Sequence, residues 1–211
     1  MAITVNQRPI FTKGGTVNTG LTIAAANTAK DGTGTVVTVY DPQRAITTLT
    51  SSGTTATATT SIPHGFLSGD SYLVSGAADN GYNGIQQITV TGPKTFTYVV
   101  AAGLTTPTSG TITADPINGS RILKVVFQPI GTNVATAARL FLNNGQTNAT
   151  VANNSYIQDV TLPITTLSEV ASMPAVVLVT DIVVPPFHKI NLTIGTTVAA
   201  GYSVYAVAGS Y

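Results

Sequence analysis

The chain contains no cysteine and no tryptophan, and charged side chains make up only 8% of its 211 residues. Without cysteine it can form neither a disulfide framework nor a thiolate metal site. Nine Lys and Arg residues, scattered singly, nearly balance eight acids and leave a net charge of +1. Because no basic patch is present to bind phosphates, we expect no nucleic-acid partner.

Long apolar runs are also absent. The longest run, AVVLV at 175–179, is far shorter than the roughly 20 residues that a membrane-spanning helix needs. The first residues, MAITVNQRPIF, lack the charged segment followed by an apolar stretch that marks a secretory signal. We therefore expect no membrane partner and no signal peptide.

Groups suited to acid–base or nucleophilic chemistry are scarce. The two histidines, His64 and His188, stand far apart in the chain, and the acids occur singly. No Ser–His–acid grouping, carboxylate pair or calcium loop is visible. We predict that the protein is not an enzyme and has no cofactor, no metal site and no catalytic residue. We expect His64 to cap a turn through its ring nitrogens.

The abundant residues are threonine, valine, alanine and glycine. Threonine and valine are β-branched and suit a pleated, half-buried surface better than a helix. An exterior rich in hydroxyls and poor in charge is unusual for a free monomer. Two interpretations stay open: a stable β-protein with a hydroxyl-rich surface, or a surface covered by copies of the chain or by a partner.

Strand-like alternation between turn signals recurs about every dozen residues, a spacing typical of all-β sandwiches and jelly rolls. Asn144-Gly145 is a hairpin signal, since both residues tolerate positive φ. Only 164–173 favours a helical turn. We predict an antiparallel β-sandwich of jelly-roll type. Its expected strands are 34–40, 121–130, 136–145, 155–163, 175–186, 188–195 and 202–211.

Residues 43–115 differ from their surroundings. They are rich in Thr and Ser, with short strand patterns between Gly, Pro and Asn-Gly turns, and Asp-Pro pairs stand at both ends. Removing them would join 34–42 directly to 117–127 as a hairpin. We predict a discontinuous outer β domain, 1–42 and 116–211, with a small β domain inserted at 43–115. The alternative is one continuous sandwich with Thr-rich strands.

A few side chains are candidates for contacts. Arg139 stands within an apolar strand, so it points to solvent, pairs with a carboxylate such as Asp159, or reaches a neighbouring subunit. Phe66, Tyr72 and Tyr82 form either an aromatic platform for a sugar or the core of the inserted domain.

Two parts of the chain resemble proteins of tailed-bacteriophage virions. His64-Gly65, Gly69-Asp70, Tyr82-Asn83-Gly84 and Thr95-Phe96-Thr97-Tyr98 follow the pattern of small Ig-like β-modules in phage structural proteins. DGTGTVVTVY, NGSRILKVVFQPIGTNVATAARLFLNNG and AAGYSVYAVAGSY are similar to a family of small virion proteins. The resemblance covers most of the chain and implies an Ig-like insert.

The resemblance also implies a function. We expect a capsid decoration (cement) protein, made in the host cytoplasm and located on the outside of the phage head. It would stabilise the head non-covalently, as a homotrimer bound to the major capsid protein. The alternative is a protein associated with the neck, tail or fibre, whose insert binds host-surface glycan through Phe66, Tyr72 or Tyr82.

Position and residue type suggest which residues make subunit or capsid contacts. The N-terminal segment 1–11 is a candidate arm that reaches a neighbouring subunit. The candidate contact residues are Arg139, Phe141, Asn143, Asn144, Gly145 and Tyr211.

Overall fold

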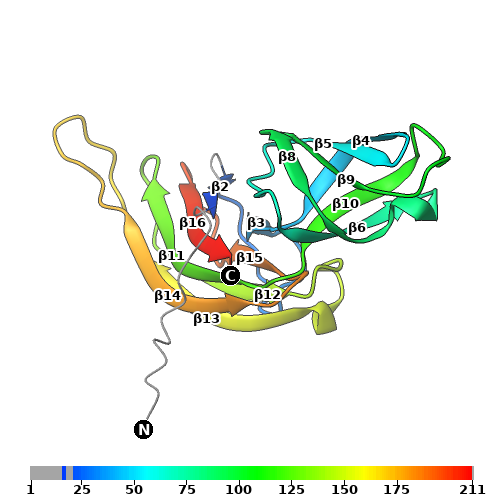
Figure 1. Ribbon diagram of the computed structural model, residues 1–211. Coiled ribbons are helices and arrows are strands. Elements are labelled where there is room, and N and C mark those ends of the chain that lie inside the picture. Colours follow the sequence, from blue (N-terminus) through cyan, green and yellow to red (C-terminus); the bar gives the residue numbers. More distant parts are fainter. Residues whose placement is uncertain (1–15, 18–20, 211) are drawn as a thin grey trace, which may run out of the picture.

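The computed structural model describes residues 16–17 and 21–210, which form two lobes (Figure 1). The described elements are antiparallel β-strands and two single-turn 3-10 helices, η1 (Asn80–Tyr82) and η2 (Val151–Asn153). The prediction of an antiparallel all-β fold is therefore confirmed. The helical turn expected at 164–173 is wrong, because this segment is an irregular loop that projects between β13 (Asn154–Leu162) and β14 (Val176–Val184). The predicted arm 1–11 and Tyr211 lie outside the described residues.

The larger lobe is a sandwich of two sheets. One sheet has the order β1-β16-β11-β14, with β2 also paired to β16, and the other has the order β13-β12-β15-β3. The strands of the first sheet are β1 (Thr16–Val17), β2 (Leu21–Ile23), β11 (Ser120–Pro129), β14 (Val176–Val184) and β16 (Tyr202–Ser210). Those of the second are β3 (Val37–Tyr40), β12 (Thr136–Asn143), β13 (Asn154–Leu162) and β15 (Lys189–Ile194).

Alternating apolar residues explain why these segments pair as a sandwich. On β11, Val125 and Phe127 point inward and are fully buried, as are Leu140 on β12 and Leu192 on β15. Side chains of a strand alternate between the two faces of a sheet, so each strand contributes every second residue to the layer between the sheets. This layer is the core of the larger lobe.

The smaller lobe is one seven-stranded sheet with the order β7-β6-β10-β4-β5-β9-β8. The sheet curls until β7 approaches β9, which nearly closes it into a barrel (Figure 1). Its interior has an apolar cluster of its own, which shares no residue with the core of the sandwich. The strands are β4 (Arg44–Ser52), β5 (Thr55–Thr60), β6 (Ser71–Ala77), β7 (Gly84–Gln87), β8 (Thr89–Gly92), β9 (Thr95–Val99) and β10 (Gly110–Pro116).

The two ends of the segment 43–115 meet at the junction of the lobes. Arg44 on β4 lies opposite Ala114 on β10, and the Gln43 side-chain amide donates to the Asp115 carboxylate at 3.1 Å. Asp115 is buried, and this burial raises the pKa of its carboxyl group. That the segment folds as an independent, Ig-like domain stays a prediction.

The expected hairpin between the flanking strands is wrong. β3 and β11 belong to opposite sheets of the sandwich, and the Tyr40 hydroxyl on β3 donates to the Ser120 hydroxyl on β11 at 2.6 Å. The chain therefore crosses from one sheet to the other through the smaller lobe. Local turn signals could not reveal this crossing, because both strand partners come from distant parts of the sequence.

Two glycines allow β6 and β10 to pair. Gly76 has φ of +82°, and a Cβ atom there would stand 2.0 Å from the Thr111 carbonyl oxygen. A Cβ atom on Gly110 would stand 2.1 Å from the Gly76 carbonyl oxygen, at an irregularity in the register of the two strands. Glycine is therefore required at this crossing, both for positive φ and for space.

We expect Gly76→Ala to destabilise the smaller lobe by more than the ~1–2 kcal/mol that positive φ alone costs, because the backbone must also move. Gly103→Ala is the matched control, since Gly103 has φ of +83° but no atom within 4 Å of the place that a Cβ would take. Urea unfolding of both variants measures the difference. Equal destabilisation would show that the close approach to Thr111 does not matter.

Candidate functional site

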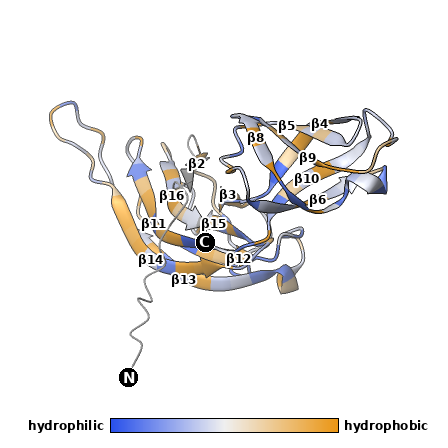
Figure 2. Cartoon of the chain, in the orientation of Figure 1, coloured by the Kyte–Doolittle hydropathy of each residue, from blue (hydrophilic) through white to orange (hydrophobic). Residues whose placement is uncertain are grey.

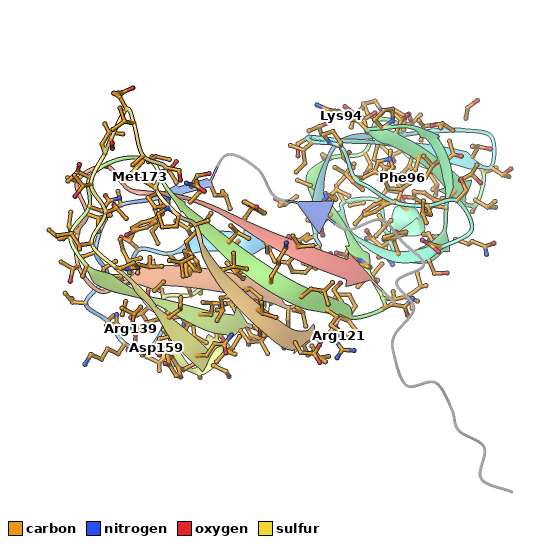
Figure 3. All side chains as sticks on the ribbon, turned by 90° about the vertical axis from the view of Figure 1, so that its left-hand side faces the viewer. Lys94, Phe96, Arg121, Arg139, Asp159 and Met173 are labelled. Atoms are coloured by element: carbon orange, nitrogen blue, oxygen red, sulfur yellow. The ribbon has the colours of Figure 1, made fainter. Side chains whose placement is uncertain are left out.

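Arg139 on β12 and Asp159 on β13 lie directly opposite one another, on the outer face of the sandwich. The register therefore brings Arg139 next to the carboxylate that was one of its three possible partners, and Figure 3 shows both at the same end of the larger lobe. Within the described part of the chain, however, no ion pair joins them. Among the residues described, Arg139 makes one long hydrogen bond, 3.4 Å from its Nη1 to the Asn27 carbonyl oxygen.

A pocket of about 360 Å³ lies over this pair and is lined by Lys30, Arg139, Tyr156 and Asp159. Tyr156, on β13, is 53% exposed and packs edge-on against Phe141, with 5.7 Å between the ring centroids. Lys30 comes from the loop between β2 and β3. The pocket thus combines two cations, one carboxylate and one aromatic ring from three segments of the chain.

Side-chain amides and a glycine hold the Lys30 loop against β12 and β13. Asn27 is buried and donates to the carbonyl oxygens of Thr33 and Thr35 at 2.6 and 2.8 Å. Gly32, with φ of +80°, packs closely against Asn154 at the start of β13. A Cβ atom added to Gly32 would stand 2.7 Å from the Asn154 Cβ. The position of Lys30 beside the pocket is therefore set by the folded loop.

The charges of the pocket act on Tyr156. Loss of hydration, and then the negative charge of Asp159, raise the pKa of the Tyr156 phenol above its ordinary value, while Arg139 partly opposes this effect. The phenol therefore stays protonated at neutral pH and remains a hydrogen-bond donor.

The other predicted contact residues of β12 are mostly internal. Phe141 is fully buried beneath Gly32 and Tyr156, so it is not a surface contact. Asn143 is also fully buried, and its side chain bonds Asn154 and the Gly145 backbone N–H. Both assignments are corrected to structural roles.

The predicted hairpin tip is a longer connection than expected. Ten residues, 144–153, join β12 to β13, where the Asn144-Gly145 signal suggested a tight turn. Asn144 and Gly145 are exposed, and Gly145 lies beside the Phe187 carbonyl oxygen near the junction of the lobes. Their contact with another subunit stays a prediction.

Of the two interpretations of the insert's aromatic residues, the core is confirmed and the aromatic platform for a sugar is wrong. Phe66, Tyr72 and Tyr82 are buried in the core of the smaller lobe, where Phe66 stacks on Tyr72 with 3.8 Å between the ring centroids. Their rings therefore cannot receive a sugar on the surface. Phe96 belongs to the same cluster and lies inside this lobe in Figure 3.

The turn-capping role of His64 is confirmed. Its Nδ1 accepts the Phe66 backbone N–H at 2.9 Å, and its Nε2 lies 3.0 Å from the Gly92 carbonyl oxygen. Nε2 therefore carries the proton and donates to this carbonyl. Both ring nitrogens are engaged, so the side chain serves the turn. In the part of the chain that the structure describes, no three His, Cys, Asp or Glu side chains gather as they would around a metal ion.

One surface was missed by the sequence reasoning. Val177, Val179 and Val183 project outward from β14 and form what we call the valine face. Val179 is 79% exposed, and β14 is coloured as hydrophobic along most of its length in Figure 2. The run VVLVTDIVV, apolar on both faces of a strand, was the available signal, since one face of a two-sheet sandwich normally meets water.

The valine face continues onto neighbouring elements. Leu123, at the irregularity of β11, is also exposed, and the 163–175 loop carries exposed Ile164, Leu167 and Val170. β14 is at the end of its sheet, so no described strand pairs with its outer edge. Charged side chains interrupt the apolar ones. Asp181 pairs with Arg121, exposed Lys124 lies opposite Val179, and exposed Glu169 stands in the loop.

None of the described helices is long and apolar enough to cross a membrane. Comparisons of the chain with models of known protein families, with curated proteins and with solved structures found no match.

Proposed function

We propose that this protein is a capsid decoration (cement) protein of a tailed bacteriophage, and that it acts by non-covalent contacts on the outside of the head. The resemblance of its motifs to those of phage virion proteins supports this proposal, as does a composition rich in threonine and poor in charge. The observation that carries it is the valine face, because an exposed apolar surface of this kind marks an interaction site.

The occupant that we propose for the valine face is a second copy of this chain. Among the described strands, β14 offers an unpaired backbone edge nine residues long, and an edge of this kind pairs with another strand. Its single acid, Asp181, is already paired with Arg121, and a neighbouring copy would have to offer an acceptor to Lys124, which lies opposite Val179 on β11. Three copies closed around an axis would match the symmetry of a capsid lattice.

In this arrangement each trimer contacts the major capsid protein and bridges neighbouring capsomers. Binding to the assembled head and not to the separated capsomers stabilises the head by mass action. The smaller lobe is attached through the two adjacent strands β4 and β10, so it can project without disturbing the contacts of the sandwich.

Copy number in purified phage particles tests the proposal. We expect an abundance comparable to that of the major capsid protein, because a decoration protein occupies the whole lattice. Quantitative mass spectrometry against the major capsid protein measures this ratio. A handful of copies per particle would instead place the protein at the neck or tail, which is the second candidate. Absence from particles would overturn both.

A further inference from the structure

We propose that the pocket lined by Lys30, Arg139, Tyr156 and Asp159 binds a saccharide that bears a carboxylate, of mono- or disaccharide size. The pocket volume, about 360 Å³, lies at the lower end of the range for small-molecule sites, which is roughly 300–1,000 Å³. The site is on the outer face of the sheet containing β12 and β13, separate from the valine face of β14. It is independent of the capsid role proposed above.

The Arg139 guanidinium has hydrogen-bond donors left for a ligand. Arg139 and Asp159 stand opposite one another on adjacent strands, yet within the described residues they form no ion pair. The Arg139 guanidinium has five N–H donors, and its single hydrogen bond, to the Asn27 carbonyl oxygen, uses one of them. Most of its donors therefore remain available inside the pocket.

The sign and placement of the charges select the ligand. Lys30 and Arg139 together outweigh Asp159, so the pocket favours one negative charge. A planar carboxylate matches the fork of a guanidinium in a bidentate pair, and the Lys30 ammonium adds a second contact. Asp159 would repel the ligand carboxylate and accept hydrogen bonds from hydroxyl groups. The ligand therefore places its acid toward Arg139 and its hydroxyls toward Asp159.

Tyr156 supplies the remaining features of a sugar site. Its exposed ring offers an apolar face for the C–H side of a pyranose, and its contact with Phe141 holds the ring in place. The protonated phenol interacts with the Asp159 carboxylate, and its oxygen has lone pairs that can accept a hydrogen bond from a ligand hydroxyl. An aromatic ring beside a carboxylate and a guanidinium suits an amphipathic, hydroxyl-rich ligand. A simple inorganic anion would make no contact with the ring.

Gly195 makes room for the guanidinium. A Cβ atom on Gly195 would stand 2.9 Å from Nη2 of Arg139 and 3.5 Å from its Cζ. Gly195 has no positive φ, so alanine is compatible with its backbone and acts only by displacing the guanidinium. Gly195→Ala is therefore a substitution that keeps every charge of the pocket and changes its geometry.

The test is isothermal titration calorimetry, in which the full chain is titrated with sodium D-glucuronate. D-glucose is the neutral analogue. We expect millimolar or tighter binding of glucuronate and at least about tenfold weaker binding of glucose, since a hydrogen bond to a charged group contributes about that factor. Arg139→Met and Tyr156→Ala should each weaken glucuronate binding by about tenfold or more, and Gly195→Ala by a smaller factor.

Arg121→Met is the matched control, because it removes a guanidinium from the outer face of β11, where Arg121 pairs with Asp181. We expect it to leave glucuronate binding unchanged. An equal loss of glucuronate affinity in Arg139→Met and Arg121→Met would mean that the anion is attracted non-specifically, and would overturn the site. Equal affinity for glucose and glucuronate, or no heat with either ligand up to tens of millimolar, would overturn it as well. None of these outcomes depends on the presence of the protein in phage particles.

Discussion

Replacing Val179 by aspartate is expected to dissociate the assembled protein into monomers and to remove it from phage particles, while the fold of the monomer is kept. Val179 is 79% exposed in the single chain, so its side chain contributes little to the core. In the proposed assembly the same position is buried against apolar groups of another copy. Lys124, opposite on β11, can pair with the new carboxylate. A buried ion pair in place of an apolar contact still costs about 1–4 kcal/mol, which is roughly five- to a thousandfold in the association constant.

Val99→Asp is the matched control for Val179→Asp. Val99 is also a strand valine, on β9 of the smaller lobe, and it is 77% exposed. Both variants add the same charge at the same exposure, so a general effect of charge on solubility or particle binding would appear in both. Sedimentation velocity measures the oligomeric mass, and particle occupancy is measured on the purified phage. An unchanged mass and occupancy for Val179→Asp would remove the valine face from the proposed assembly.

Truncating Phe96 to alanine is expected to lower the unfolding temperature of the smaller lobe and to leave that of the sandwich unchanged. Phe96 is fully buried among Phe66, Tyr98 and His64, and loss of a core phenylalanine costs about 3–5 kcal/mol. The apolar clusters of the two lobes share no residue, so the cavity left by Phe96 lies inside one cluster only. Scanning calorimetry should show two transitions, with one lowered by about 4–8 °C for each kcal/mol lost.

Phe127→Ala provides the reciprocal variant. Phe127 is the same residue type, equally buried, in the core of the sandwich, so its truncation should lower the other transition. Together the two variants decide whether residues 43–115 form an independent domain. A single cooperative transition, lowered alike by both substitutions, would mean that the two lobes unfold as one unit and that the nested-domain prediction is wrong.

Local patterns in the sequence predicted the strands of the sandwich closely. The expected strands 121–130, 155–163 and 188–195 correspond to β11, β13 and β15, with ends shifted by one residue. Alternation of apolar and polar residues depends only on neighbouring positions, so it can be read without knowledge of the partners. His64 was likewise predictable, because a turn cap is a local arrangement of a few residues.

The sequence did not predict the burial of side chains that are covered by residues from distant segments. Phe141 belongs to the outward side of β12, yet the Lys30 loop and Tyr156 cover it. For Phe66, Tyr72 and Tyr82 the sequence left a sugar platform and a core position both open, and the curling of their sheet turns them inward. Neither form of burial follows from the residues nearby in the chain.

The sequence by itself therefore determined the all-β class, most of the strands and the scarcity of catalytic groups, since these depend on composition and on the spacing of neighbouring residues. Only the tertiary structure decided that β3 and β11 lie in opposite sheets, that Arg139 and Asp159 share a pocket with Lys30 and Tyr156, and that the outward valines of β14 stay uncovered. The physical reason is that exposure and proximity are set by long-range strand pairing, which no local pattern records.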